Sequence, residues 1–204
     1  MKVLDVGCGD GGFRPYAKDA EYWGLDPNFG GTRPDILAEP IEEHAPKRPG
    51  YYDIVCSFQV IEHVPDPLGF ARAMVAALKP GGLLVLGVPS WPAPVTEIPN
   101  YVMNAPPHHL TWWNEASLRA LAERLGLRCR DVIDCPIGGH SSIIYWMARF
   151  APTLDRTRYF RAAWSWHLAL IWAWLAGSAA DALLRIPPGA RTSEIMMIAE
   201  KPAS

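Results

Sequence analysis

Short apolar runs alternate with helical patterns along most of the chain, and each run ends at turn-forming residues. The apolar runs predict strands at 2–6, 21–26, 34–38, 52–58, 83–88, 127–133 and 193–200. The run at 83–88 is apolar throughout, so we expect a central strand covered on both faces. Helical periodicity covers 13–18, 67–78 and 115–125. Strands that alternate with helices in this way predict an α/β fold with a doubly wound, largely parallel sheet.

The stretch between the last two predicted strands is longer than a turn requires. We therefore expect one domain over 1–204, in which 134–192 form a largely helical insertion. Residues 162–180 contain no Asp, Glu, Lys or Arg but include Trp164, Trp166, Trp172 and Trp174. A membrane-spanning helix here would separate the last strand from its sheet. The open alternatives are a lid over an acceptor pocket, peripheral membrane contact through 159–186, and a homodimer contact or simple core packing.

Composition narrows the class of protein. The chain has 204 residues, of which 50% are hydrophobic and 20% are charged, with a formal net charge of -2. This content excludes disorder as the main state, and the absence of excess positive charge argues against nucleic acid as a partner. Four cysteines without a CxxC pair and the absence of a signal-peptide pattern predict a cytoplasmic protein, with or without peripheral contact on the inner membrane face.

A glycine-rich turn follows the first predicted strand directly. It contains Gly7, Gly9, Gly11 and Gly12 and leads into the first predicted helix. Doubly wound folds bind ligands at the carboxyl ends of their strands, and glycines there let a ligand approach bare backbone. The turn alone does not identify the ligand.

Three acidic residues next to successive strand ends indicate which ligand this is. Asp5 precedes the turn, Asp26 ends the second strand and Glu39 follows the third. Like charges about 4 Å apart repel by about 1 kcal/mol in water and by more when partly buried, so Asp5 disfavours a pyrophosphate and hence a nicotinamide oxidoreductase. The acids suit S-adenosylmethionine, with Asp26 accepting from the ribose hydroxyls. Glu39, and less well Asp35, is expected to accept from the adenine amino group.

Segments 3–11, 24–27, 52–57 and 78–82 resemble the successive motifs of class I S-adenosylmethionine-dependent methyltransferases. The resemblance covers about 1–133 and the last strand. It implies a Rossmann-like seven-stranded sheet of order 3-2-1-4-5-7-6 with strand 7 antiparallel, and S-adenosylmethionine as cofactor. Cys8 is expected to be a small packing residue rather than a reactive thiol. The implied cofactor-binding residues are Asp5, Gly7, Cys8, Gly9, Gly11, Asp26, Pro27, Glu39, Ser57, Phe58 and Gln59.

The segment 59–67, QVIEHVPDP, resembles the signature of the type 11 and type 23-like methyltransferase branch that includes ubiquinone-pathway O-methyltransferases. The resemblance implies O-methylation of a small-molecule, glycan or lipid-linked acceptor. We expect the other half of the acceptor pocket from the loop 89–113, whose PPHH-x-x-x-W pattern resembles uncharacterised members of the same branch.

Three histidines are candidates for removing the acceptor's proton, since neutral imidazole is a suitable base near pH 7. We expect His108 or His109 as the general base, with His63 as the runner-up, and Glu62, Trp112 and Trp113 as substrate-binding residues. The alternative is structural: Glu62 and His63 hold a helix cap, and one of the paired histidines fixes the loop.

In some relatives a similar cluster holds a divalent metal. Glu62, His63 and His109, or His108 in its place, could supply ligands here. The first position of that cluster is Gln59, a weaker ligand, so we expect no metal. Some relatives with such a cluster act on RNA, which the net charge disfavours.

Members of this family usually carry helices ahead of the first strand, whereas the strand pattern here opens at residue 2. We then expect the insertion to cover the cofactor in place of those helices. The alternative is a non-catalytic module that binds S-adenosylmethionine or a partner.

Overall fold

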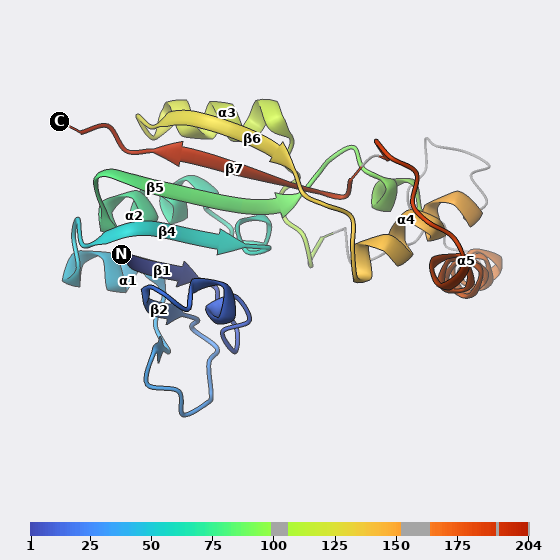
Figure 1. The fold of residues 1–204 in the computed structure, drawn as a ribbon, viewed down its shortest axis with the longest axis horizontal. Coiled ribbons are helices and arrows are strands. Elements are labelled where there is room, and N and C mark those ends of the chain that lie inside the picture. The colour runs from blue at the N-terminus through green and yellow to red at the C-terminus, as the bar shows by residue number, and fades with distance from the viewer. Residues whose placement is uncertain (99–105, 152–163, 191, 204) are drawn as a thin grey trace. The chain divides into compact units, whose positions relative to one another are not determined.

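A seven-stranded sheet forms the centre of the computed structural model, which describes residues 1–98, 106–151, 164–190 and 192–203 (Figure 1). The strand order is β3-β2-β1-β4-β5-β7-β6, as predicted. The strands β1 to β5 pair in parallel, and β7 runs antiparallel to its neighbours in the sheet (Figure 1). The strands are β1 (Lys2–Val6), β2 (Glu21–Leu25), β3 (Ile36–Leu37), β4 (Tyr52–Phe58), β5 (Leu78–Pro89), β6 (Arg128–Asp134) and β7 (Glu194–Glu200).

The chain divides into two compact units, and each is described by itself. The first comprises Met1–Val88, Glu115–Ile133 and Met196–Ser204, and the second comprises Pro89–Asn114 and Asp134–Ile195. The central strands of the first unit are fully buried at Leu4, Val55 and Leu84, which explains the apolar residues in the middle of each strand.

Helices of the first unit are α1 (Ile41–His44), α2 (Pro67–Ala77) and α3 (Glu115–Arg124), with the 3-10 turns η1 (Arg14–Ala17), η2 (Ala45–Lys47) and η3 (Ile61–His63). At the start of α2, the Asp66 carboxylate accepts from the Gly69 N–H at 2.9 Å, and Pro67 occupies the first turn, where no backbone donor is needed.

Two local expectations differ from the structure. The helix predicted at 13–18 is only the 3-10 turn η1, which contains Pro15 and has no side-chain cap. The strand β5 begins at Leu78 rather than after the glycines, because the Gly81 N–H donates to Lys201 O and the Lys201 N–H donates to Gly82 O. Pairing with the segment that follows β7 thus makes the glycines that were expected to end the helix part of the sheet.

The second unit is built around two helices, α4 (His140–Phe150) and α5 (Trp164–Leu183), which pack together (Figure 1). The short turn η4 (Pro94–Glu97) joins them through a shared core that includes Val95, Ile98, Ile144, Met147 and Ala173. The described residues of the predicted insertion are therefore largely helical, and they pack with the start of the loop that follows β5. Among the described residues, none of the helices combines the length and the apolar character needed to cross a bilayer.

Candidate cofactor site and acceptor residues

The turn after β1 requires glycine at specific positions. Gly7, Gly9 and Gly11 have φ of 75°, 53° and 82°, in the left-handed region that side chains disfavour. A Cβ on Gly7 would lie 2.3 Å from Val60 Cγ2. The N–H groups of Gly7 and Cys8 donate to Leu25 O at 2.7 and 3.1 Å, so the turn is fixed to the end of β2.

Asp5 lies near the carboxyl end of β1 and is almost completely buried, with 3% exposure. The Tyr22 hydroxyl donates to its Oδ2 at 2.8 Å. Burial raises the pKa of Asp5 to about 6, although the hydrogen bond from Tyr22 acts in the opposite direction. A buried carboxylate that receives only neutral donors, the Tyr22 hydroxyl and the Cys56 thiol, and that has a raised pKa is a favourable partner for a cationic group.

Asp26 follows β2 directly, and the registers Asp5↔Gly24 and Val6↔Leu25 place it along the same edge of the sheet as the glycine turn. Its Oδ2 accepts from the Gly9 N–H at 2.9 Å, and its Oδ1 accepts from the Asn28 N–H at 2.9 Å. These bonds fix the carboxylate beside the turn. Pro27, the next predicted cofactor residue, is exposed. Asp5, the turn 7–11 and Asp26 are called the strand-end site below.

Two arginines of the first unit lie near this site and are bound to a third acid. Arg33 forms an ion pair with Asp35 at 2.8 Å and donates to Asp10 O at 2.9 Å, and Arg14 lies 3.4 Å from the same carboxylate. The Arg33 guanidinium lowers the pKa of Asp35. Asp35 therefore neutralises the positive charge near the turn, and the carboxylate of Asp5 makes the site electrically negative.

Cys8 packs against β2. Its Sγ fills the space above Gly24, where a Cβ would lie 2.5 Å away. Burial, reinforced by Asp5 and Asp26, raises the pKa of the Cys8 thiol to about 12. The thiol therefore remains protonated and is a poor nucleophile.

The end of β4 brings the next predicted residues to the same edge. Ser57 is buried and its hydroxyl donates to Val6 O at 2.8 Å, which links β4 to β1. Phe58 packs on Phe13 with ring centroids 5.0 Å apart. Gln59 has φ of 58°, and among the described residues it is the one non-glycine residue with positive φ. Such strain is concentrated at functional sites, so it is consistent with the predicted binding role of Gln59.

Glu39 lies in a different environment from the one its predicted role requires. Its carboxylate forms an ion pair with Lys47 and receives a 2.7 Å hydrogen bond from His44 Nδ1. A small cavity of about 220 Å³ lined in part by these residues also includes Tyr52, whose hydroxyl lies 2.7 Å from His44 Nε2. Adenine recognition by Glu39 stays a prediction, since a ligand would compete with these two partners.

The 59–67 segment forms η3 after β4. Glu62 has 1% exposure, and its Oε1 lies 3.8 Å from His63 Nε2. The side-chain cap of α2 is Asp66, not Glu62 or His63 as the structural alternative supposed. The turn η3 thus places a buried acid beside a partly exposed imidazole.

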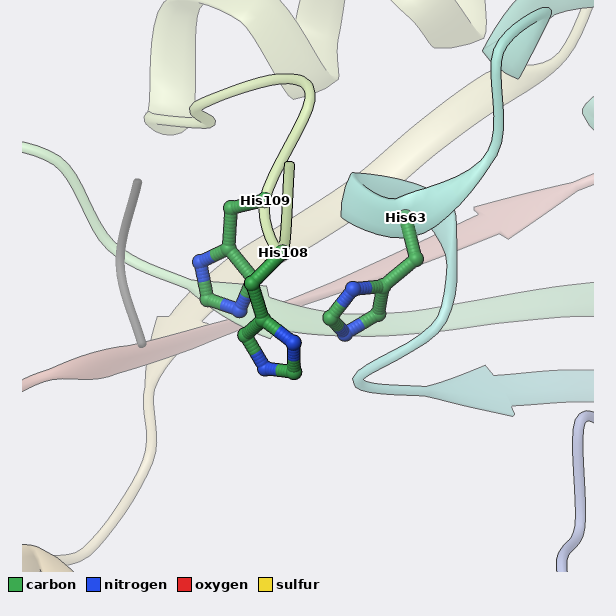
Figure 2. A group of neighbouring side chains, drawn as sticks. All are labelled: His63, His108 and His109. Carbon is green, nitrogen blue, oxygen red and sulfur yellow. The ribbon is translucent and has the colours of Figure 1, made fainter. Parts of the chain in front are cut away.

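The paired histidines of the second unit stack on one another. The rings of His108 and His109 have centroids 5.0 Å apart and an interplanar angle of 18° (Figure 2). His108 is exposed and His109 is half-buried. Of the two predicted substrate tryptophans, Trp112 is 48% exposed, whereas Trp113 is buried and its Nε1–H donates to Thr111 Oγ1 at 3.0 Å. Trp113 is thus packed inside the protein, and substrate binding by either tryptophan stays a prediction.

Two contributors to the strand-end site did not emerge from the motifs. Tyr22 donates to Asp5 from the neighbouring strand, and Val60 closes the space above Gly7. The alternation of β2 offers a weak signal for Tyr22, since Tyr22 and Gly24 share one face of the strand. The position of Val60 depends on the path of the chain after β4, which sequence periodicity does not encode.

Sequence and structure comparisons agree with this geometry. A family model described as a methyltransferase domain matches residues 1–132. The ubiquinone biosynthesis O-methyltransferase of Escherichia coli O139:H28 is 41% identical over 95 residues, which cover 40% of each chain. The same values hold for the enzyme of that name from Shigella boydii serotype 18. The chain thus spans well under half the length of the curated relatives it matches.

Two solved structures share the fold. A SAM-dependent methyltransferase from Archaeoglobus fulgidus has a TM-score of 0.64 and 19% identity, covering 98% of this chain and 86% of that one. A putative methyltransferase from Bacillus halodurans has a TM-score of 0.59 and 19% identity, covering 98% of this chain and 92% of that one. With the strand order, the strand-end acids and the family match together, the chain belongs to the methyltransferase-domain family and has the class I S-adenosylmethionine-dependent fold.

Proposed function

We propose that this protein transfers a methyl group from S-adenosylmethionine to an oxygen atom of a small-molecule, glycan or lipid-linked acceptor. The observation that carries the proposal is the strand-end site, where the buried Asp5 and the fixed Asp26 lie on either side of a left-handed glycine turn. The choice of oxygen is supported by the names of the curated relatives, which are O-methyltransferases.

The residues present fit S-adenosylmethionine. The strand-end carboxylates offer acceptors and negative charge, which suit a ligand with an ammonium group, a sulfonium group and ribose hydroxyls. Asp5 would neutralise the positive charge, and Asp26 would accept from the hydroxyls while it retains the Gly9 hydrogen bond. Gly9, where a Cβ would meet no atom within 4 Å, leaves space for close approach to the backbone.

When bound, the cofactor supplies an electrophilic methyl group, so the protein must position the acceptor and remove its proton. Holding the acceptor oxygen in line with that group at about 3 Å supplies most of the rate enhancement. We assign proton removal to His109 or His108, because a neutral imidazole accepts a proton near pH 7. His63 is the next candidate, with Glu62 as the acid that would orient it or stabilise its charged form.

Calorimetric titration of S-adenosylmethionine into the purified chain tests the cofactor assignment, with Asp26→Ala as the site variant and Asp19→Ala as a control acid outside the site. The proposal expects saturable binding that Asp26→Ala weakens at least about tenfold. NADH serves as the competing ligand, and tight NADH binding with none by S-adenosylmethionine would overturn the assignment. Formation of S-adenosylhomocysteine across a panel of hydroxyl-bearing acceptors then tests transfer, and its absence with every acceptor would favour a binding module.

A further inference from the structure

The helix α5 has two apolar faces of different character. One face is made of small residues, Ala173, Gly177 and Ala180, and is buried. A Cβ at Gly177 would lie 2.9 Å from Met147 N, which shows how closely α4 approaches. Small side chains allow this close helix packing, and it explains the glycine in the middle of a helix.

The opposite face of α5 carries large apolar side chains that are more than half exposed. At 100° per residue, positions 164, 168, 171, 172 and 175 fall on the side of the helix away from 173, 177 and 180. A helix that is apolar on all sides is normally buried or in contact with lipid, so this face requires a partner. The exposed side chains are Trp164, Leu168, Ile171, Trp172, Trp174, Leu175 and Leu183.

Charge is distributed unevenly around this helix. Residues 149–191 contain six arginines and two aspartates, a formal charge of +4, whereas the rest of the chain carries -6. The helix α5 itself contains one residue among Asp, Glu, Lys and Arg, namely Asp181 near the C-terminal end of the helix. The apolar face therefore lies within a basic segment of an otherwise acidic protein, and an anionic partner is expected.

We infer that this face of α5 docks on the interface of a membrane that contains anionic lipids, with the helix lying in the plane of the surface. Tryptophan prefers the headgroup boundary, and arginines that flank the helix in the sequence favour anionic lipid. Because β6 and β7 are neighbours in one sheet, the chain must return to its starting side, which suits a helix that lies on the bilayer.

A second copy of the chain fits this face less well. Bulky indoles prevent the close approach that the small residues on the other face permit, and two copies would bring basic segments together. The lipid contact is independent of the methyl-transfer chemistry, although it would bring the protein to lipid-linked acceptors.

Flotation of the full chain with vesicles tests the inference. Binding is expected to vesicles of mixed phosphatidylcholine and phosphatidylglycerol, and to be at least about tenfold weaker with phosphatidylcholine alone. A Trp172→Ala/Trp174→Ala variant should bind the mixed vesicles at least about tenfold more weakly, because it lacks two indoles that would be buried in the lipid on binding. The tryptophan emission of the unmodified chain should shift to shorter wavelength on binding.

Tyr16→Ala is the matched control, because Tyr16 is an aromatic residue with 83% exposure outside this helix. It should leave vesicle binding unchanged, and circular dichroism should show both variants folded. Arg158→Gln/Arg161→Gln should reduce binding to anionic vesicles only. Failure of the unmodified chain to float with anionic vesicles would overturn the inference. Light scattering that shows a dimer, dissociated by the Trp172/Trp174 variant, would assign the face to a second copy instead.

Discussion

The Tyr22 hydroxyl donates a 2.8 Å hydrogen bond to Asp5 Oδ2 in the interior of the first unit. Asp5 belongs to β1 and Tyr22 to the adjacent β2, so strand pairing brings the two together. The bond supports a carboxylate that burial would otherwise keep neutral up to still higher pH. The ionised form of Asp5 thus lowers the free energy of unfolding, and its pKa of about 6 makes both stability and ligand binding depend on pH.

Substitution of Asp5 by Asn should stabilise the protein above pH 6 and weaken cofactor binding. The folded-state pKa of this acid lies about two units above its ordinary value, so its ionisation opposes folding as pH rises from about 4 to 6. Removing the charge should recover up to about 3 kcal/mol of the free energy of unfolding at pH 8, and nothing below pH 4. Urea unfolding at both pH values measures this, and calorimetry should show cofactor affinity at least about tenfold lower. A variant that loses both stability and cofactor affinity would contradict the assignment of Asp5 as a buried, destabilising carboxylate.

Affinity for S-adenosylmethionine should fall as pH decreases through 6. A cationic ligand binds the ionised form of Asp5, whose protonation becomes dominant below its pKa of about 6. We expect about tenfold weaker binding at pH 5 than at pH 8, with proton release on binding at pH 5.5. Titrations in buffers of different ionisation enthalpy measure the released protons. The Asp5→Asn variant is the control and should show a flat profile over this range.

Substitution of the catalytic base should lower transfer without changing cofactor affinity. His109→Ala, His108→Ala and His63→Ala are compared by the rate of S-adenosylhomocysteine formation with an identified acceptor. The base variant should lose about 100-fold to 10,000-fold in rate, and the acidic limb of its pH profile should disappear. His167→Ala is the matched control, an exposed histidine on α5. Full turnover by all three test variants would remove histidine from the mechanism.

Methyl transfer should survive a strong chelator. The sulfonium methyl is already electrophilic, and the amide of Gln59 is a weaker metal ligand than a carboxylate. The rate after dialysis against EDTA is therefore expected to match the untreated rate. Loss of activity that Mn²⁺ or Zn²⁺ restores would instead assign ligand roles to Glu62, His63 and His109.

Introducing valine at Gly177 should destabilise the second unit. The added side chain would collide with the Met147 backbone, 2.9 Å from the first carbon alone, and overpacking of this kind costs about 1–3 kcal/mol. Hydrogen exchange in α4 and α5 should accelerate. Ala179→Val is the control, because Ala179 is exposed on the same helix. Equal exchange in both variants would contradict the close packing.

The residues that the sequence motifs assign to the strand-end site lie together in the structure, and their binding role stays a prediction. Asp5, Asp26 and the glycine turn are adjacent because strands in parallel register end at one edge, a relation that the element order already implies. Glu39 shows the limit of this reasoning. It follows β3 as predicted, but Lys47 and His44 hold its carboxylate, and their positions depend on the short elements α1 and η2, which have no strong periodic signal.

The sequence by itself determined the strands, the glycine turn, the acids beside it and the helices of the insertion, because periodicity and turn residues act locally. The strand order was implied by the resemblance to class I methyltransferases. Only the tertiary structure decided that burial raises the pKa of Asp5, that Trp113 is buried while Trp112 is exposed, and which side of α5 packs on α4. These properties depend on which distant segments exclude water from a given side chain. Desolvation arises from three-dimensional neighbours, so a linear pattern cannot specify it.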